Sequence, residues 1–196
     1  MLRNSVCYPF SVQPLVIGIP RSVKLIEEVT QGDHLLGLLA MKDSSIEEPL
    51  PGQVYEVGTV GRVLRVLRTL DNTLQAVVQG LERFRVEHWL RPEPYLKARI
   101  RVIPDIVQSD LEMDALQRSL RELAQEVINL SPIIPNAAGD FLAMIQDPRM
   151  LVYMVLFTMP IEVNEGQKLL EMDDLKDKLR ALIIHLTHEK EVLSLG

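Results

Sequence analysis

The residues that could carry chemistry are few, and they do not form a recognisable catalytic set. His185 and His188 stand three positions apart in a predicted helix, so their imidazoles could reach one metal ion, but no third ligand is evident. The chain has no G-x-x-x-x-G-K-[ST] phosphate loop, no G-x-S-x-G or H-E-x-x-H motif, and a single cysteine, Cys7. We therefore expect no catalytic residues, no cofactor and no metal ion in this chain.

A second group of candidates is basic. Residues 60–101 contain nine Lys or Arg and four Asp or Glu, whereas residues 102–196 contain eight and sixteen. Five of the basic residues alternate along two predicted strands: Arg83, Arg85, Lys97, Arg99 and Arg101. Converging side chains of this kind would attract nucleic-acid phosphates. We favour the alternative, that they are the solvated faces of antiparallel strands, because few aromatic side chains lie nearby for base stacking.

A third candidate is the apolar segment Met150–Met159, which is interrupted only by Tyr153 and Thr158. A surface helix of a small bundle normally has a polar face, so this helix is either buried or partly exposed for binding. Methionine-rich surfaces adapt to varied partners. The candidate protein-binding residues are Met144, Met150, Met154, Phe157 and Met159. We favour a central core helix, with part of the stripe serving both roles.

Residues 1–105 are predicted to form a β domain with one helix. The β-rich runs Gly58–Leu70 and Thr73–Gln79 flank a polar turn and indicate a hairpin, and Gly80 is expected to end the second strand. Tyr95–Val102 alternates, with its apolar side chains directed inward and its basic side chains outward. Short strands separated by turns close into a barrel or pseudo-barrel.

Residues 106–196 are predicted to be helical. An amphipathic stripe over residues 116–130 is followed by shorter helices and by a last helix over Asp173–Leu195, whose leucines form a heptad seam. Each residue extends a helix by about 1.5 Å, so we expect the last helix to run beyond the body of its domain by about Leu186. The leucines expected to be uncovered are candidates for self-association: Leu182, Leu186 and Leu193.

The composition of the chain indicates the class of protein and its cellular compartment. The chain is 47% apolar and 24% charged, as in ordinary soluble globular proteins. A single cysteine excludes an internal disulfide framework and fits a reducing compartment. Pro9, Pro14 and Pro20 interrupt the first residues, which lack the continuous apolar run of a signal peptide. These features predict a cytoplasmic protein without a membrane-spanning segment.

Several motifs, in a fixed order along the chain, resemble one family. Leu2–Asn4 and Pro14–Ser22 are similar to an opening of the form L-R-D…P-L-x-V-G-x-P-R-S, and Val54–Thr59 is similar to its most recognisable hexamer. The hairpin continues into V-x-G-x-x-R-x-x-V, and Glu165–Glu171 is similar to an E-K-Q-x-L-L-E helix. The chain resembles the N-terminal, substrate-recognition domain of the Lon family of ATP-dependent serine proteases.

The resemblance implies an α+β fold, with a PUA-like β pseudo-barrel over residues 1–105 and a helical arm over 106–196 that ends in a long exit helix. It implies that this region binds unfolded or damaged proteins and supports a homo-oligomeric ring. ATPase and protease modules, with ATP and Mg, would lie elsewhere in a longer protein. The alternative is a standalone Lon-like β-domain protein that acts as an adaptor or binds nucleic acid.

Overall fold

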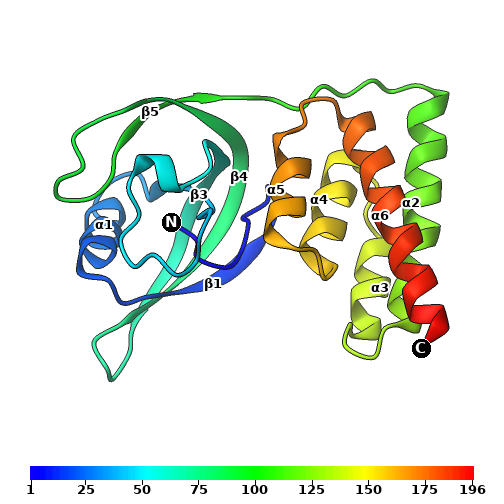
Figure 1. Cartoon of the computed structure of the whole chain (residues 1–196), viewed down its shortest axis with the longest axis horizontal. Helices are drawn as coiled ribbons and strands as arrows, with labels where there is room; N and C mark the ends of the chain where they lie inside the picture. Colours follow the sequence, from blue (N-terminus) through cyan, green and yellow to red (C-terminus); the bar gives the residue numbers. More distant parts are fainter. The chain divides into compact units, whose positions relative to one another are not determined.

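The computed structural model describes every residue of the chain, 1–196, and divides it into two compact units, Met1–Ile103 and Pro104–Gly196. The first unit contains a five-stranded sheet and a helix, and the second contains five helices (Figure 1). The elements of the first unit are β1 (Val12–Ile17), α1 (Pro20–Thr30), β2 (Leu35–Leu38), β3 (Val57–Arg68), β4 (Leu74–Trp89) and β5 (Ala98–Val102).

The antiparallel hairpin of β3 and β4 organises the first unit. The strand order is β1-β4-β3-β2, and β5 pairs with the second half of β4, opposite Phe84–Trp89. The hairpin turn contains Asn72 in the left-handed region, at φ 65°, where asparagine is favoured over most residues. Leu74, Ala76 and Val78 are buried on one face of β4, as their alternation predicts. Figure 1 shows the turn extending beyond the rest of this unit.

Gly80 does not end the second strand of the hairpin, contrary to the sequence-based expectation. β4 runs through it for sixteen residues. The amide of Gly80 donates to Ser11 O at 2.8 Å, and its carbonyl accepts from Phe10 N at 2.9 Å, so the segment before β1 continues the pairing with β4 there. A Cβ at this position would lie 2.1 Å from Tyr8 O. The glycine is therefore required by the close approach of another backbone rather than by a break in the strand.

β5 also differs from the sequence-based expectation. Its alternation predicts that Ile100 and Val102 point inward, but they are 38% and 51% exposed. The physical reason is that β5 pairs only with β4 and lies at the edge of the sheet, so that water reaches side chains on both of its faces.

The second unit consists of α2 (Leu111–Leu130), α3 (Asn136–Ala143), α4 (Pro148–Thr158), α5 (Val163–Glu171) and α6 (Leu175–Leu195). Helix α2 begins at Asp110, whose carboxylate accepts from Met113 N at 2.9 Å, a regular N-cap. Figure 1 shows α2 and α6 side by side. No helix of the chain combines the length and the apolar character needed to cross a membrane.

Helices α2 and α6 run parallel to each other, as two ion pairs show: one joins the starts of the helices and the other joins their ends. Lys176 pairs with Asp110 at the start of the two helices, and Lys190 pairs with Glu126 near their ends. The hydrogen bond from Lys176 lowers the pKa of the Asp110 carboxyl. The α6 seam is therefore covered by α2, and Leu182 and Leu186 have no exposed surface. This corrects the expectation that they extend beyond the domain; of the predicted self-association residues, only Leu193 is half-exposed.

A buried cluster of charged and polar side chains joins the beginning of the second unit to its last helices. The carboxylate of Asp105 accepts from Lys178 Nζ at 3.1 Å, from Arg149 Nε at 3.0 Å and from the Tyr153 hydroxyl at 2.9 Å. The Lys178 ammonium also donates to the carbonyl of Met172. The side chains of Asp105 and Lys178 have no exposed surface, so each charge depends on the other for its stability in the interior.

Replacing Gly80 by Ala should reduce the free energy of unfolding of the first unit by about 1–3 kcal/mol, because the new methyl group collides with a backbone oxygen. Trp89 is the only tryptophan, so its fluorescence during urea unfolding reports this unit. Gly52→Ala is the matched control, because a Cβ there meets nothing within 4 Å. Equal stability of the two variants would contradict the steric account.

Replacing Lys178 by Met should reduce the free energy of unfolding of the helical unit by about 3–5 kcal/mol, because it leaves the Asp105 carboxylate buried without its ammonium partner. Chemical unfolding followed by far-ultraviolet circular dichroism measures this change. Lys168→Met removes a lysine from a pair with Glu165 on the surface of α5 and should change stability by at most about 0.5 kcal/mol. A similarly small effect at Lys178 would show that the buried pair is not needed.

Candidate functional site

The predicted methionine-rich surface is not assembled in the structure. Met154 and Met159 are each 5% exposed, Met150 is half-buried, and only Met144 and Phe157 are exposed, at 79% and 42%. Residues 151–156 of α4 are all buried, because the helix packs among α2, α3 and α6. Helix α4 therefore has the core role that the sequence favours, and the five residues do not share one binding surface.

The predicted basic residues do not form a continuous patch either. Arg83 has no exposed surface. Arg85 and Arg101 lie opposite each other on β4 and β5, and Arg101 Nε is 3.7 Å from the carboxylate of Glu87. Arg99 and Lys97 are exposed. One member is therefore interior and another is ion-paired, so this face of the sheet offers fewer free cations than the sequence suggests.

Three further side chains considered for chemistry are Cys7, His185 and His188. Burial raises the pKa of the Cys7 thiol to about 11, so the thiolate nucleophile is scarce at neutral pH. His185 and His188 lie on α6, and no group of three side chains in the chain is arranged to hold a metal ion.

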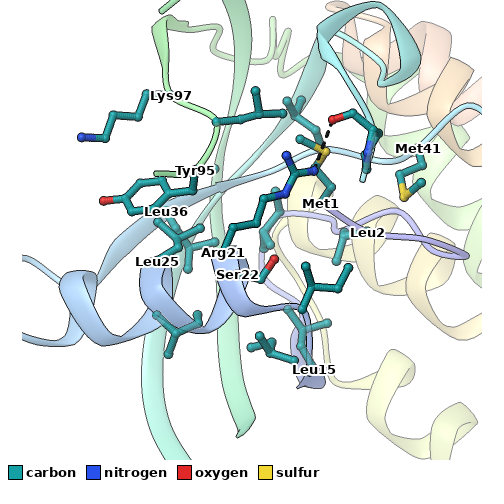
Figure 2. A pocket seen from close by; sticks show the side chains of 18 of the residues that line it. Met1, Leu2, Leu15, Arg21, Ser22, Leu25, Leu36, Met41, Tyr95 and Lys97 are labelled. Carbon is teal, nitrogen blue, oxygen red and sulfur yellow. Dashed lines mark hydrogen bonds between the residues drawn. The ribbon is translucent and has the colours of Figure 1, made fainter. Parts of the chain in front are cut away.

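A largely apolar pocket of about 790 Å³ opens in the first unit. Its walls come from α1, β1, β2, the N-terminal segment and the segment 89–98 that leads into β5 (Figure 2). The lining includes Leu15, Leu25, Leu36 and Leu96, which are half-buried and so present apolar surface to an occupant. Pockets of this size and character, with a few polar groups at defined places, are typical of ligand-binding sites.

Several polar side chains line the pocket. In Figure 2, Arg21 and Ser22 project from the first turns of α1 into the pocket, and Tyr95 and Lys97 lie together on one side of it. Arg21 Nη2 donates to Pro49 O at 3.2 Å, the hydrogen bond drawn in the figure. Lys97 Nζ lies 5.1 Å from the centre of the Tyr95 ring, within the range of a cation–π interaction.

A hydrogen bond fixes the side of the pocket that is formed by Tyr95. The Tyr95 hydroxyl donates to the carboxylate of Glu28 on α1, and this bond raises the pKa of the tyrosine above its usual value. The tyrosine therefore stays neutral at physiological pH and ties the segment before β5 to the helix. The pocket cannot be predicted from the sequence, because its lining comes from separated segments whose alternation indicates only which side chains are partly buried.

The residues at the pocket do carry one signal in the sequence. Pro20–Ser22 belongs to the opening motif that resembles the Lon family, and it starts α1. Proline is well suited to the first turn of a helix, because its φ is fixed near the helical value and the missing amide has no intrahelical partner there. The motif starts the helix that carries Arg21 and so places Arg21 at the pocket. The motif predicts the start of the helix but does not by itself indicate a pocket there.

Comparison with known proteins identifies relatives along the whole chain. Residues 1–188 match the family described as the ATP-dependent protease La (LON) substrate-binding domain. The Lon protease of Dictyoglomus thermophilum is 37% identical over 195 residues, which is 100% of this chain and 24% of that protein. Lon protease 2 of Sorangium cellulosum is 36% identical over 98% of this chain and 24% of its own length. The chain thus spans about a quarter of the length of these relatives.

Solved structures share the fold. The N-terminal domain of the Mycobacterium avium complex Lon protease matches with a TM-score of 0.74 at 19% identity, over 94% of both chains. The Lon N-terminal domain protein of Xanthomonas campestris matches with a TM-score of 0.66 at 17% identity, over 93% of this chain and 94% of that one. The predicted α+β fold with a long last helix is confirmed. The chain belongs to the family of Lon substrate-binding domains.

Proposed function

We propose that this chain is the substrate-recognition region of a Lon-type ATP-dependent serine protease and that it binds unfolded or damaged proteins in the cytoplasm. Unfolding and cleavage would belong to ATPase and protease modules outside these residues, where ATP and Mg would bind. The homo-oligomeric ring that the family implies is part of the same proposal, with the helical unit supporting assembly.

The observation that carries the proposal is the apolar pocket of the first unit. Unfolded proteins differ from folded ones chiefly in the apolar side chains that they expose, and burying such side chains is the main source of affinity available to a recognition site. Leu25 and Leu36 present half-buried apolar surface on facing elements, α1 and β2. An extended apolar segment would bury this surface together with its own side chains.

The pocket is a better candidate than the other exposed apolar residues. Leu70 is fully exposed at the hairpin turn and Ile184 is 71% exposed on α6, but neither lines this pocket. Isolated apolar side chains on a surface are common and need no partner. A concave site removes more apolar surface from water for each residue bound.

The test is binding to ribonuclease that has been reduced and alkylated with a neutral reagent, so that it stays unfolded. The chain should bind this probe weakly and the native ribonuclease at least about tenfold more weakly, as fluorescence anisotropy can measure. Leu25→Ser should lower the affinity for the unfolded probe by about tenfold, the effect expected when one leucine no longer buries its side chain against the bound segment.

Leu70→Ser is the matched control, because it makes the same chemical change at an exposed leucine outside the pocket. It should leave binding unchanged. If a folded Leu25→Ser variant still binds the probe, or if Leu70→Ser no longer binds it, the binding site lies outside the pocket. No binding of the unfolded probe by the unchanged chain would contradict the proposed function itself.

A further inference from the structure

Three cationic side chains line the pocket without a carboxylate partner. They are Arg3, Arg21 and Lys97, and none of them lies within 4 Å of an acidic side chain. Arg68 and Arg101 of the same unit are ion-paired, with Glu27 and Glu87. The three cations of the pocket have no such pair and are available to an anionic ligand.

Arg21 is the best placed of the three. It is half-buried, it projects into the pocket, and its one protein hydrogen bond is to the carbonyl of Pro49 (Figure 2). A guanidinium carries several N–H donors in a planar fork that matches a carboxylate, so most of its donors remain free. A partly desolvated cation with few protein partners is stabilised by an anionic ligand.

The two other cationic side chains of the lining agree with Arg21 in sign. Arg3 donates to the carbonyls of Ser44 and Glu47, which leaves its positive charge unneutralised, and Lys97 lies over the ring of Tyr95. The acidic side chain that lines the pocket is Glu47, and it is exposed. With three cations and one acid, the lining of the apolar pocket carries a net positive charge, which is complementary to an occupant with both apolar side chains and a negative charge.

We propose that the pocket selects apolar segments of unfolded polypeptides that carry an acidic side chain, whose carboxylate pairs with Arg21. This inference rests on the proposed function and adds its substrate class. Apolar side chains of the segment lie against Leu25 and Leu36, and the carboxylate lies at the guanidinium. A segment with a basic residue in the same place is disfavoured by like-charge repulsion, which gives selectivity beyond apolar character.

The experiment uses three short peptides that are blocked at both ends and rich in leucine, valine and serine. They differ only in a central glutamate, glutamine or lysine. The whole chain should bind the glutamate peptide about threefold to tenfold more tightly than the glutamine peptide, and the lysine peptide most weakly, with differences that shrink as salt rises. Equal affinity for the glutamate and glutamine peptides would overturn the inference.

Variants locate the effect. Arg21→Gln should abolish the preference for glutamate over glutamine, whereas Arg21→Lys, which keeps the charge but not the fork, should reduce and not abolish it. Lys24→Gln is the matched control, because Lys24 is an exposed cation on the same helix that does not line the pocket. A preference that survives in Arg21→Gln, or that disappears in Lys24→Gln, would overturn the assignment. If Arg21→Gln does not fold, Arg21→Lys and the salt dependence decide the question.

Two further measurements distinguish carboxylate selectivity from the proposed function itself and from nucleic-acid binding. Binding of unfolded ribonuclease without any glutamate preference would leave the proposed function standing and overturn the carboxylate selectivity alone, whereas failure to bind any peptide or unfolded protein would overturn both. A single-stranded oligonucleotide should not displace the glutamate peptide. Displacement by the oligonucleotide would show that Arg21 serves phosphates instead, and would overturn the assignment.

Discussion

The β unit depends on two places where the backbone of another segment approaches a glycine so closely that no side chain fits. A Cβ at Gly58 would lie 2.1 Å from the carbonyl oxygen of Leu38, and one at Gly80 would lie 2.1 Å from that of Tyr8. The segments that approach there are the end of β2, whose Leu38 lines the pocket, and the N-terminal segment, whose first residues line it. The two glycines in β3 and β4 therefore help to position segments that form the wall of the pocket.

The helical unit is held in a different way. Its interior contains an ion pair with no exposed surface, and Asp105 collects donors from Lys178, Arg149 and Tyr153. Such a pair adds little net stability compared with apolar residues of the same size, but it permits few alternative arrangements, because a misplaced partner leaves a buried charge. The ion pairs between α2 and α6 add to this effect, because they fix how these two helices are aligned along their length.

Local structure could be predicted well from the sequence, whereas positions that depend on distant segments could not. The alternation of Leu74, Ala76 and Val78 correctly indicates a half-buried strand, and the prolines and polar turns bound most helices within a few residues. A glycine that ends a strand, the role expected of Gly80, and one that admits the close approach of another backbone have the same sequence signal. The length of α6 does not reveal which neighbour covers its leucine seam, and α2 covers Leu182 and Leu186. The alternation along β4 does not reveal that Arg83 is buried. The pocket joins separated segments, so residue patterns could indicate only its half-buried wall.

Hydrogen exchange of the whole chain, measured by mass spectrometry with and without unfolded ribonuclease, tests most directly whether the pocket of the β unit receives substrate. We expect slower exchange on binding in α1, in β2 and in the segment 89–98 before β5, all of which line the pocket, and no change at the hairpin turn around Leu70 or along α6. Protection confined to the helical unit, or to the hairpin turn, would contradict it.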